Sequence, residues 1–386
     1  MINELREKVE QLLFNIDEQE LESFSVVKNV LLTDGSTEIG FAVLEELLYK
    51  TEADVWVITQ VDDFNNVQFK EESERLNREM LEKFGYSRVH FIEGKIHEER
   101  FGIDQEEWDE LAGKIDVVIY NRCVNSFMKP YQLLYQTNVS PIFEIIKFSY
   151  HKKRKKVVDF SMANVLCGDN DGSECSYNEY DIVENVASRY GLVKSKGAVE
   201  YVLSCARDRG LPVLVMRFPH IVPSPKAKVW DKRDFLLLRV KLCIQMGEIP
   251  DVDFPYYLIP ERTLAEIIVK FAQFEEGFFI PAIPSELTWN EILRTFLSVA
   301  DRDYAMVPLE RFVDNAVEYI KKISNRELST VIPFLRMKNA GFDCPLFNND
   351  DFMKSVAKYD IYLPDMKQIA NEMLGTPIGE WLIGNE

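Results

Sequence analysis

Three residues, Asp34, Thr37 and Gly40, occupy the positions at which a dinucleotide-binding turn carries its glycines. In such a turn the first glycine allows a tight bend, the second lets the pyrophosphate approach the backbone, and the third lets the helix pack against the strand. Only the third position, Gly40, is a glycine in this chain. The pattern therefore predicts a strand–turn–helix unit that keeps its packing contact and has lost its phosphate-facing positions.

Two carboxylates oppose phosphate binding at the same turn. Asp34 and Glu38 fall where a diphosphate would lie on the N-terminus of the helix. A carboxylate about 4 Å from a phosphate costs roughly 1 kcal/mol per charge pair in water and about 4 kcal/mol in a partly shielded site. We therefore expect no cofactor at this turn.

Two further patterns could handle protons. Tyr190 and Lys194 are four residues apart, which on a helix places both on one face. His220 follows a predicted strand in the stretch RFPHIV, at the edge where ligands bind in a parallel sheet. It is either a base that reaches a pocket or a hydrogen-bonded loop histidine.

The elements that position these residues alternate between short apolar strands and helices. Six runs rich in Val and Ile predict strands at residues 27–33, 54–59, 88–93, 117–120, 156–161 and 212–217. Such strands with helices between them are typical of βαβ units. The sequence therefore predicts an α/β fold with a doubly wound, Rossmann-like and mostly parallel sheet.

Three parts are expected along the chain. Apolar residues at helical spacing predict an N-terminal amphipathic helix within residues 1–26, and the Rossmann-like domain follows at 27–247. The regular alternation stops there, so residues 248–386 are expected to form a mainly helical subdomain that covers the mouth of the sheet. Within it, Thr288 and Glu291 have the form of a capping box, and another helix should follow Pro308.

Composition narrows the class of protein. The 386 residues carry a net charge of −19, which argues against nucleic acid as a partner. No apolar run approaches the roughly 20 residues of a membrane span, so no membrane partner is expected. The scattered cysteines are expected to be reduced thiols, as in a cytoplasmic protein. The six cysteines and four histidines show no metal-ligand spacing, so no metal site is expected.

A basic run, 151–156, precedes the fifth predicted strand. It therefore belongs to the amino edge of the sheet, whereas ligands bind at the carboxyl edge. We interpret it as a solvated loop rather than a docking site for an acidic carrier protein.

Six stretches spread over nearly the whole chain carry a family resemblance. They are VLLTDGSTEIG, FGIDQEEWDELAGKIDVVIYN, NSFMKPYQLLYQTNV, SKGAVEYVLSCARDRGLPVLVMRFPHIV, IPDVDFPYYLIPERTLAEIIV and AGFDCPLFNND. In this order they resemble the terminal thioester reductase domains of nonribosomal peptide synthetases and carboxylic acid reductases, which are extended short-chain dehydrogenases.

The resemblance implies NADPH binding and reduction of a carrier-bound thioester by a serine or threonine, a tyrosine and a lysine. This chain departs from that pattern at most positions. Gln60 replaces the arginine expected at the 2′-phosphate, Lys95 replaces the aspartate that contacts adenine, and residues 121–123 (Asn-Arg-Cys) replace small residues that face the cofactor. The hydroxyl position falls on Met162, with Ser161 beside it.

The tyrosine and lysine positions can be matched in two registers. The stretch SKGAVE and the spacing that follows it match the family without a gap only if Lys196 is the lysine, and Leu192 then stands at the tyrosine position. The other register uses Tyr190 and Lys194. We favour the first, in which two of the three catalytic groups are absent.

The predicted function follows from the resemblance and its departures. Reductase-like release domains that lack the tyrosine release tethered chains by Dieckmann-type cyclisation, and we expect this redox-inactive chemistry, without a cofactor, on an acyl or peptidyl chain held by the phosphopantetheine of a carrier protein. His220 would be the base, and Lys196 and Ser161 the donors to the oxyanion. Two alternatives stay open: a non-catalytic scaffold module, and an active NAD(P)H-dependent reductase that uses Tyr190 and Lys194.

Overall fold

The computed structural model describes most of the chain. The described residues are 2–14, 27–35, 37–59, 78, 82, 87–126, 129–167, 176–181, 188, 190–223, 232, 234–283, 287–337 and 346–384.

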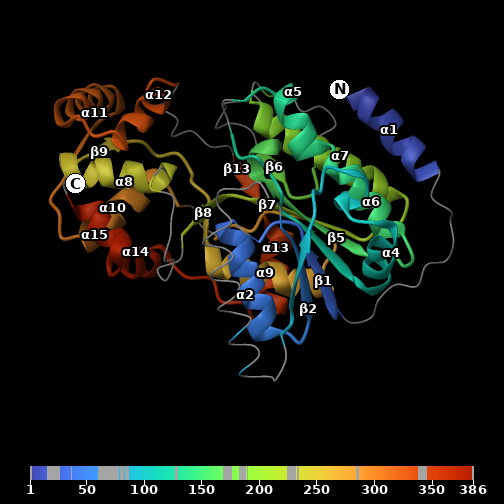
Figure 1. Cartoon of the computed structure of the whole chain (residues 1–386). Helices are drawn as coiled ribbons and strands as arrows, with labels where there is room; N and C mark the ends of the chain where they lie inside the picture. Colours follow the sequence, from blue (N-terminus) through green and yellow to red (C-terminus); the bar gives the residue numbers. More distant parts are fainter. Residues whose placement is uncertain are drawn as a thin grey trace.

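A seven-stranded parallel sheet forms the centre of the molecule (Figure 1). In spatial order its strands are β11 (Gly277–Phe279), β7 (Val213–Phe218), β5 (Lys156–Met162), β4 (Val117–Tyr120), β1 (Asn29–Leu32), β2 (Asp54–Thr59) and β3 (Val89–Glu93). Both faces are covered, so the central strands are buried throughout and need side chains such as Val and Ile on each face. The predicted doubly wound α/β fold is confirmed.

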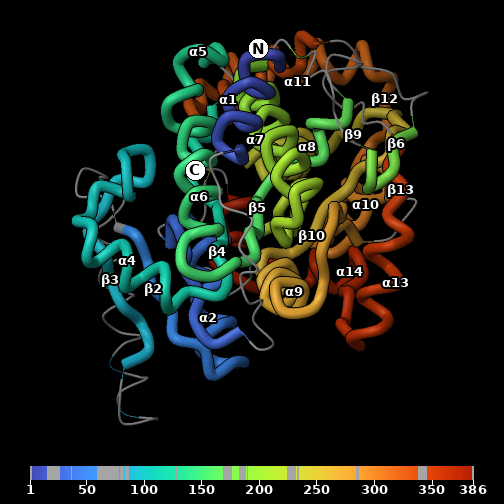
Figure 2. The backbone as a smooth tube through the Cα atoms, turned by 90° about the vertical axis from the view of Figure 1, so that its right-hand side faces the viewer, coloured from blue at the N-terminus to red at the C-terminus, as the bar shows by residue number. Residues whose placement is uncertain are grey.

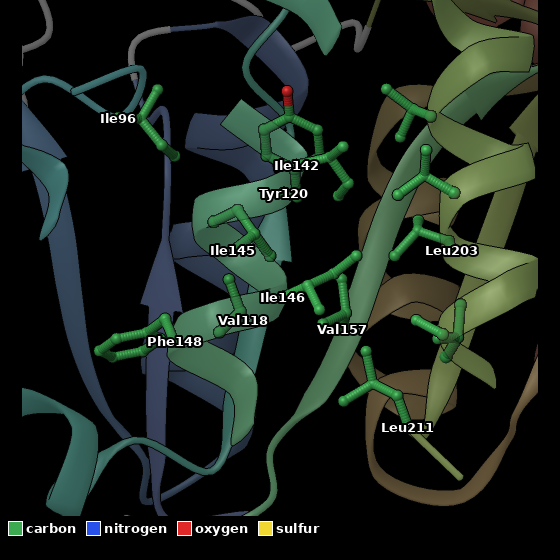
Figure 3. Close-up of a cluster of buried hydrophobic side chains, with 14 of the residues drawn as sticks. Ile96, Val118, Tyr120, Ile142, Ile145, Ile146, Phe148, Val157, Leu203 and Leu211 are labelled. Carbon is green, nitrogen blue, oxygen red and sulfur yellow. The ribbon is translucent and has the colours of Figure 1, made fainter. Parts of the chain in front are cut away.

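Helices cover the two faces of the sheet. One face carries α1 (Ile2–Phe14), α4 (Gln105–Lys114), α5 (Tyr131–Leu134), α6 (Pro141–Tyr150) and α7 (Gly191–Asp208). The other carries α2 (Glu38–Lys50), α9 (Glu261–Phe274) and α13 (Asp350–Lys358). Figure 3 shows Ile145 and Ile146 of α6 and Leu203 of α7 in one apolar layer with Val118 and Val157 of the strands. This burial fixes α7 against β5, and with it the candidate site residues on both elements.

The remaining helices form a second lobe beside the sheet (Figure 1). They are α8 (Phe235–Met246), α10 (Trp289–Val299), α11 (Leu309–Ile323), α12 (Ile332–Leu335), α14 (Met366–Leu374) and α15 (Pro377–Ile383). The capping box of Thr288 and Glu291 and the helix after Pro308 are confirmed. The three-part division of the chain stays a prediction, although the sheet takes its edge strand β11 from beyond residue 247.

The N-terminal helix α1 packs along α7, as Figure 2 also shows. Leu5, Val9 and Leu13 are buried against the sheet-side core, and the Arg6 Nε donates to the Tyr201 hydroxyl of α7 at 2.8 Å. The apolar positions predicted from the sequence are therefore the face on which α1 packs. Residues 15–26 of the predicted segment lie outside the described residues.

Three short parallel pairs connect distant parts of the chain. They are β6 (Ser176–Asn178) with β13 (Leu346–Asn348), β8 (His220–Val222) with β10 (Leu258–Pro260), and β9 (Glu248–Asp251) with β12 (Ala305–Pro308). Glu179, just after β6, strengthens the first of these connections. Its carboxylate accepts backbone N–H bonds from Ile280 (2.8 Å), Asp351 (2.9 Å) and Phe352 (3.0 Å). One buried side chain thus joins the segment after β5 to the end of β11 and the start of α13.

Replacing Glu179 with alanine should destabilise the fold by about 2–3 kcal/mol, because three backbone donors lose their acceptor. Urea unfolding followed by circular dichroism measures the loss. Glu275→Ala is the matched control, since Glu275 contacts the other end of α13 through Lys358 (3.0 Å) and Tyr359. It should cost about 1 kcal/mol or less, as partly exposed contacts do. Equal losses in the two variants would contradict the role given to Glu179.

The basic run 151–156 is a solvated loop only over residues 151–154, and the prediction fails for its last two lysines. Lys155 and Lys156 are buried, and the Lys156 ammonium donates to the carbonyls of Ala272 (3.0 Å) and Glu275 (3.1 Å) at the end of α9. Burial lowers the pKa of Lys155 to about 7. The prediction was wrong because last-turn carbonyls of a helix need donors, and lysines can supply them.

Candidate functional site

The turn between β1 and α2 is tightly built. Thr37 is the N-cap of α2, and its Oγ1 accepts the Gly40 N–H at 3.0 Å. A Cβ on Gly40 would lie 2.3 Å from the Asp34 carbonyl oxygen and 2.7 Å from the Asn121 Nδ2, so only glycine fits there. The helix therefore packs against its strand as the sequence predicts, while a side chain already occupies the capping position at its N-terminus.

Arg122 and Asp34 form an ion pair at this turn. The Arg122 Nη1 lies 2.9 Å from the Asp34 Oδ2, and the two side chains are only 19% and 8% exposed. Asn121 holds the same region, since its backbone N–H donates to the Thr33 Oγ1 (3.1 Å) and its Nδ2 to the Thr37 Oγ1 (3.2 Å). Sequence reasoning noted residues 121–123 but missed this pairing. The strand order could have revealed this ion pair, because β1 and β4 are neighbours and the residues that follow them lie close together.

The other two expected nucleotide positions are less informative. Gln60 lies outside the described residues. Lys95 follows β3 and its exposed ammonium pairs with Glu98 at 3.1 Å, while its backbone N–H donates to the Phe101 carbonyl at 2.7 Å. Lys95 therefore holds a surface turn together.

One face of α7 is directed at the end of β5. Leu192, Lys196 and Glu200 are spaced four apart on the helix and all three are buried. The Lys196 ammonium donates to the Phe160 carbonyl of β5. Tyr190 is the N-cap residue of α7: its own backbone is extended, and its carbonyl accepts the Lys194 N–H at 3.1 Å in the first turn of the helix. The register that uses Lys196 and Leu192 remains the one we favour.

A buried ion pair engages the hydroxyl of Ser161. Ser161 donates to the Glu200 carboxylate, which Arg217 also binds with Nε at 3.1 Å and Nη2 at 2.8 Å. Arg217 further donates to the carbonyls of Glu179 and Asp181, both at 2.7 Å. The Ser161 proton is thus committed to Glu200 and is not directed at a substrate oxygen. Met162, at the expected hydroxyl position, ends the strand.

Asp159 is a fully buried carboxyl group beside this cluster. Neither of its oxygens has a hydrogen-bond partner among the described residues. Burial raises its pKa to about 7, the nearby Lys196 and Arg217 oppose the shift, and Glu200 adds to it. Sequence reasoning did not find Asp159, because an acidic residue inside the apolar run KVVDFSM gives no indication of its partners.

Asp159→Asn should make the protein more stable at pH 8 by about 4 kcal/mol and leave its stability near pH 4 unchanged. The pKa of Asp159 is higher in the folded state than its ordinary 3.8, so the stability of the wild type falls as the pH rises from about 4 to about 7. An asparagine carries no charge to bury at any pH. Urea unfolding at a series of pH values measures the difference, and a gap that is the same at pH 4 and pH 8 would contradict it.

His220 begins β8, at the junction with the second lobe (Figure 1). Its Nε2 lies 3.0 Å from the Asp234 Oδ2, and its ring is 5.8 Å from that of Tyr256. Asp234 is itself the N-cap of α8 and accepts the Leu237 N–H at 2.8 Å, so it is held in place. The Nε2 has no hydrogen-bond partner among the described residues, so Asp234 lies beside the ring without a hydrogen bond to it. A histidine next to a fixed carboxylate can serve as a base.

The three predicted catalytic residues are therefore divided between two places. Lys196 and Ser161 lie together at the carboxyl end of β5, and in the described part of the chain no contact joins either of them to His220. Nor do the described residues hold a group of three or more His, Cys, Asp or Glu side chains suited to a metal ion. Within the same residues, no helix is long and apolar enough to cross a bilayer.

Residues 32–266 match the model of a family described as "Male sterility protein", a group of NAD-binding domains. Among curated proteins, the chain is 25% identical over 64% of its length to a linear gramicidin synthase protein of Brevibacillus parabrevis, of which it covers 5%. It is 24% identical over 62% of its length to the large subunit of L-2-aminoadipate reductase of Eremothecium gossypii, of which it covers 18%. The chain thus spans a fifth or less of these relatives.

Solved structures share the fold over almost the whole chain. The terminal R domain of the myxalamid PKS-NRPS pathway superposes with a TM-score of 0.81 at 20% identity, over 97% of each chain. The R domain of a nonribosomal peptide synthetase from Mycobacterium tuberculosis gives 0.74 at 18% identity, over 97% of this chain and 99% of that one. A thiolation-reductase di-domain from an archaeal synthetase gives 0.71 at 17%, over 99% and 81%.

Proposed function

The chain belongs to the family described as "Male sterility protein", and from that premise we propose that it acts on a carrier-bound acyl or peptidyl thioester without hydride transfer. The thioester reductase-like fold supports the substrate class. The closed turn between β1 and α2 supports the absence of hydride transfer.

The main support for the proposal is the turn between β1 and α2. A dinucleotide diphosphate needs free backbone donors and positive charge at the helix N-terminus. Here the Thr37 hydroxyl has taken one of those N–H groups, and the nearby cation, Arg122, is bound to the Asp34 carboxylate. The residues present do not fit an NADPH diphosphate, so no step of the proposed reaction passes through one.

The residues at the expected proton-donor positions also argue against reduction of the thioester. Leu192 and Met162 stand where the resemblance places a tyrosine and a hydroxyl residue, and neither side chain can donate a proton. The alternative reductase would need Tyr190 and Lys194, and Tyr190 lies at the N-cap of α7 rather than within the helix.

The proposed reaction is a Dieckmann-type release. A base removes a proton from an acidic carbon of the tethered chain, the carbanion attacks the thioester carbonyl, a carbon–carbon bond forms, and the carbon–sulfur bond breaks to free the carrier thiol. His220, which lies beside Asp234, is the proposed base, and Lys196 is the proposed donor to the developing oxyanion. Ser161 would join Lys196 only if it turned away from Glu200.

The proposed partner is a carrier protein whose phosphopantetheine holds the substrate. One structural neighbour is titled a thiolation-reductase di-domain, which supports this pairing. Because a tethered substrate is already close to the site, few protein groups are needed to accelerate its cyclisation. A cytoplasmic place for this assembly is part of the same proposal.

Single turnover of a carrier-bound thioester with an acidic internal carbon tests the function. We expect release of a cyclised product together with free thiol in the absence of NADPH, and no faster release when NADPH is added. Release that consumes NADPH would establish the reductase alternative. No release under either condition would favour the scaffold alternative.

A further inference from the structure

The ion pair of Asp34 and Arg122 is largely withdrawn from water. Its two atoms are 2.9 Å apart, and the side chains are 8% and 19% exposed. An arginine fork binds carboxylate and phosphate oxygens with the same geometry. Arg122 is therefore bound to an internal group whose charge and oxygen spacing resemble those of a phosphate.

The surroundings of the pair otherwise suit an anion. Gly40 brings the thirteen-residue helix α2 close to the turn, and the ends of β1 and β4 deliver Asp34 and Asn121 to the same place. Asn121 is 6% exposed, and its Oδ1 lacks a hydrogen-bond partner among the described residues. Because an amide oxygen accepts hydrogen bonds, this atom needs a donor and does not itself favour an anion; the features of the turn that do are the N-terminus of α2 and the Arg122 guanidinium.

We propose that the Asp34 carboxylate is a built-in plug, an internal anion that occupies the Arg122 guanidinium in place of a diphosphate. The inference rests on the proposed function and deepens it, since it assigns the loss of dinucleotide binding chiefly to one side chain. Asp34 acts twice, because it neutralises Arg122 and also repels any phosphate that approaches the helix N-terminus.

The plug predicts a specific gain of binding. Asp34→Asn keeps the shape of the side chain and removes its charge, so the internal anion that Arg122 binds is gone and an external anion can compete for the guanidinium. Calorimetric titration with inorganic pyrophosphate and with NADPH should show binding by Asp34→Asn that is about tenfold or more tighter than by the wild type. The double variant Asp34→Asn/Arg122→Gln should lose that gain.

Glu38→Gln is the matched control. It removes one negative charge from the first turn of the same helix and leaves both residues of the ion pair in place, so its gain in binding should be clearly smaller than that of Asp34→Asn. An equal gain in Glu38→Gln and Asp34→Asn would overturn the plug and leave a general charge effect in its place. Asp34→Ser serves as a second variant if Asp34→Asn does not give a native circular dichroism spectrum.

The remaining outcomes separate this inference from the proposed function. Folded Asp34 variants that bind no better than the wild type overturn the plug, while a wild type that does not bind NADPH leaves the proposed function in place. A wild type that binds NADPH at micromolar concentration overturns both. Loss of the gain in the double variant supports the plug, and a gain that survives without Arg122 overturns it.

Discussion

Replacing Arg217 with methionine should lower the free energy of unfolding by about 3–5 kcal/mol, the cost of leaving a buried charge without its partner. Arg217 is fully buried and Glu200 is 2% exposed, and the guanidinium binds both carboxylate oxygens. The same side chain holds the carbonyls of Glu179 and Asp181. Its removal therefore strips one carboxylate and two carbonyls of their donor at once.

A second substitution distinguishes the buried charge from lost packing. Arg217→Met/Glu200→Gln removes the orphaned charge and leaves Ser161 an amide partner, so it should regain most of the lost stability. Arg207→Met is the control, because Arg207 also lies over the Phe278 ring (5.0 Å, against 4.8 Å for Arg217) but is partly exposed. Urea unfolding gives all four values. A double variant as unstable as Arg217→Met would contradict the argument from charge.

The sheet could be predicted from the sequence because its strands are buried on both faces. Runs such as DVWVIT and VVIY leave little room for another interpretation, and all six predicted strands lie within two residues of the observed ones. The edge strand β11 was missed because it has only three residues, Gly277–Phe279, which carry no pattern of their own. Its place in the sheet depends on the packing of α9, which local sequence does not reveal.

The candidate site was less predictable, because its residues are set by tertiary contacts. That Asp34 meets Arg122 follows only once β1 and β4 are known to be neighbours. That Ser161 donates to Glu200 depends on which face of α7 meets β5. Glu179, Asp159 and Asp234 gave no sequence signal, since an isolated carboxylate in a sequence is usually a solvated one.

Replacement of His220 tests whether this histidine is a catalytic base or a structural residue. If His220 removes the substrate proton, its replacement by alanine should slow product release by about 10²–10⁴-fold, the contribution usual for a positioned base. The fold should be little affected, since the side chain is part-exposed and its Nε2 has no hydrogen-bond partner among the described residues. Added imidazole should then restore part of the rate, which a purely structural role would not allow.

His90→Ala provides the comparison in the same single-turnover assay of thioester release. His90 also faces an aspartate, with its Nε2 3.4 Å from the Asp54 Oδ1, but it lies on the edge strand β3 and stacks on Trp56. It should release product at the wild-type rate with or without imidazole. If His220→Ala does the same, the base must be sought elsewhere, and Lys196 at the end of β5 becomes the remaining candidate among the residues proposed, because the Ser161 proton is held by Glu200.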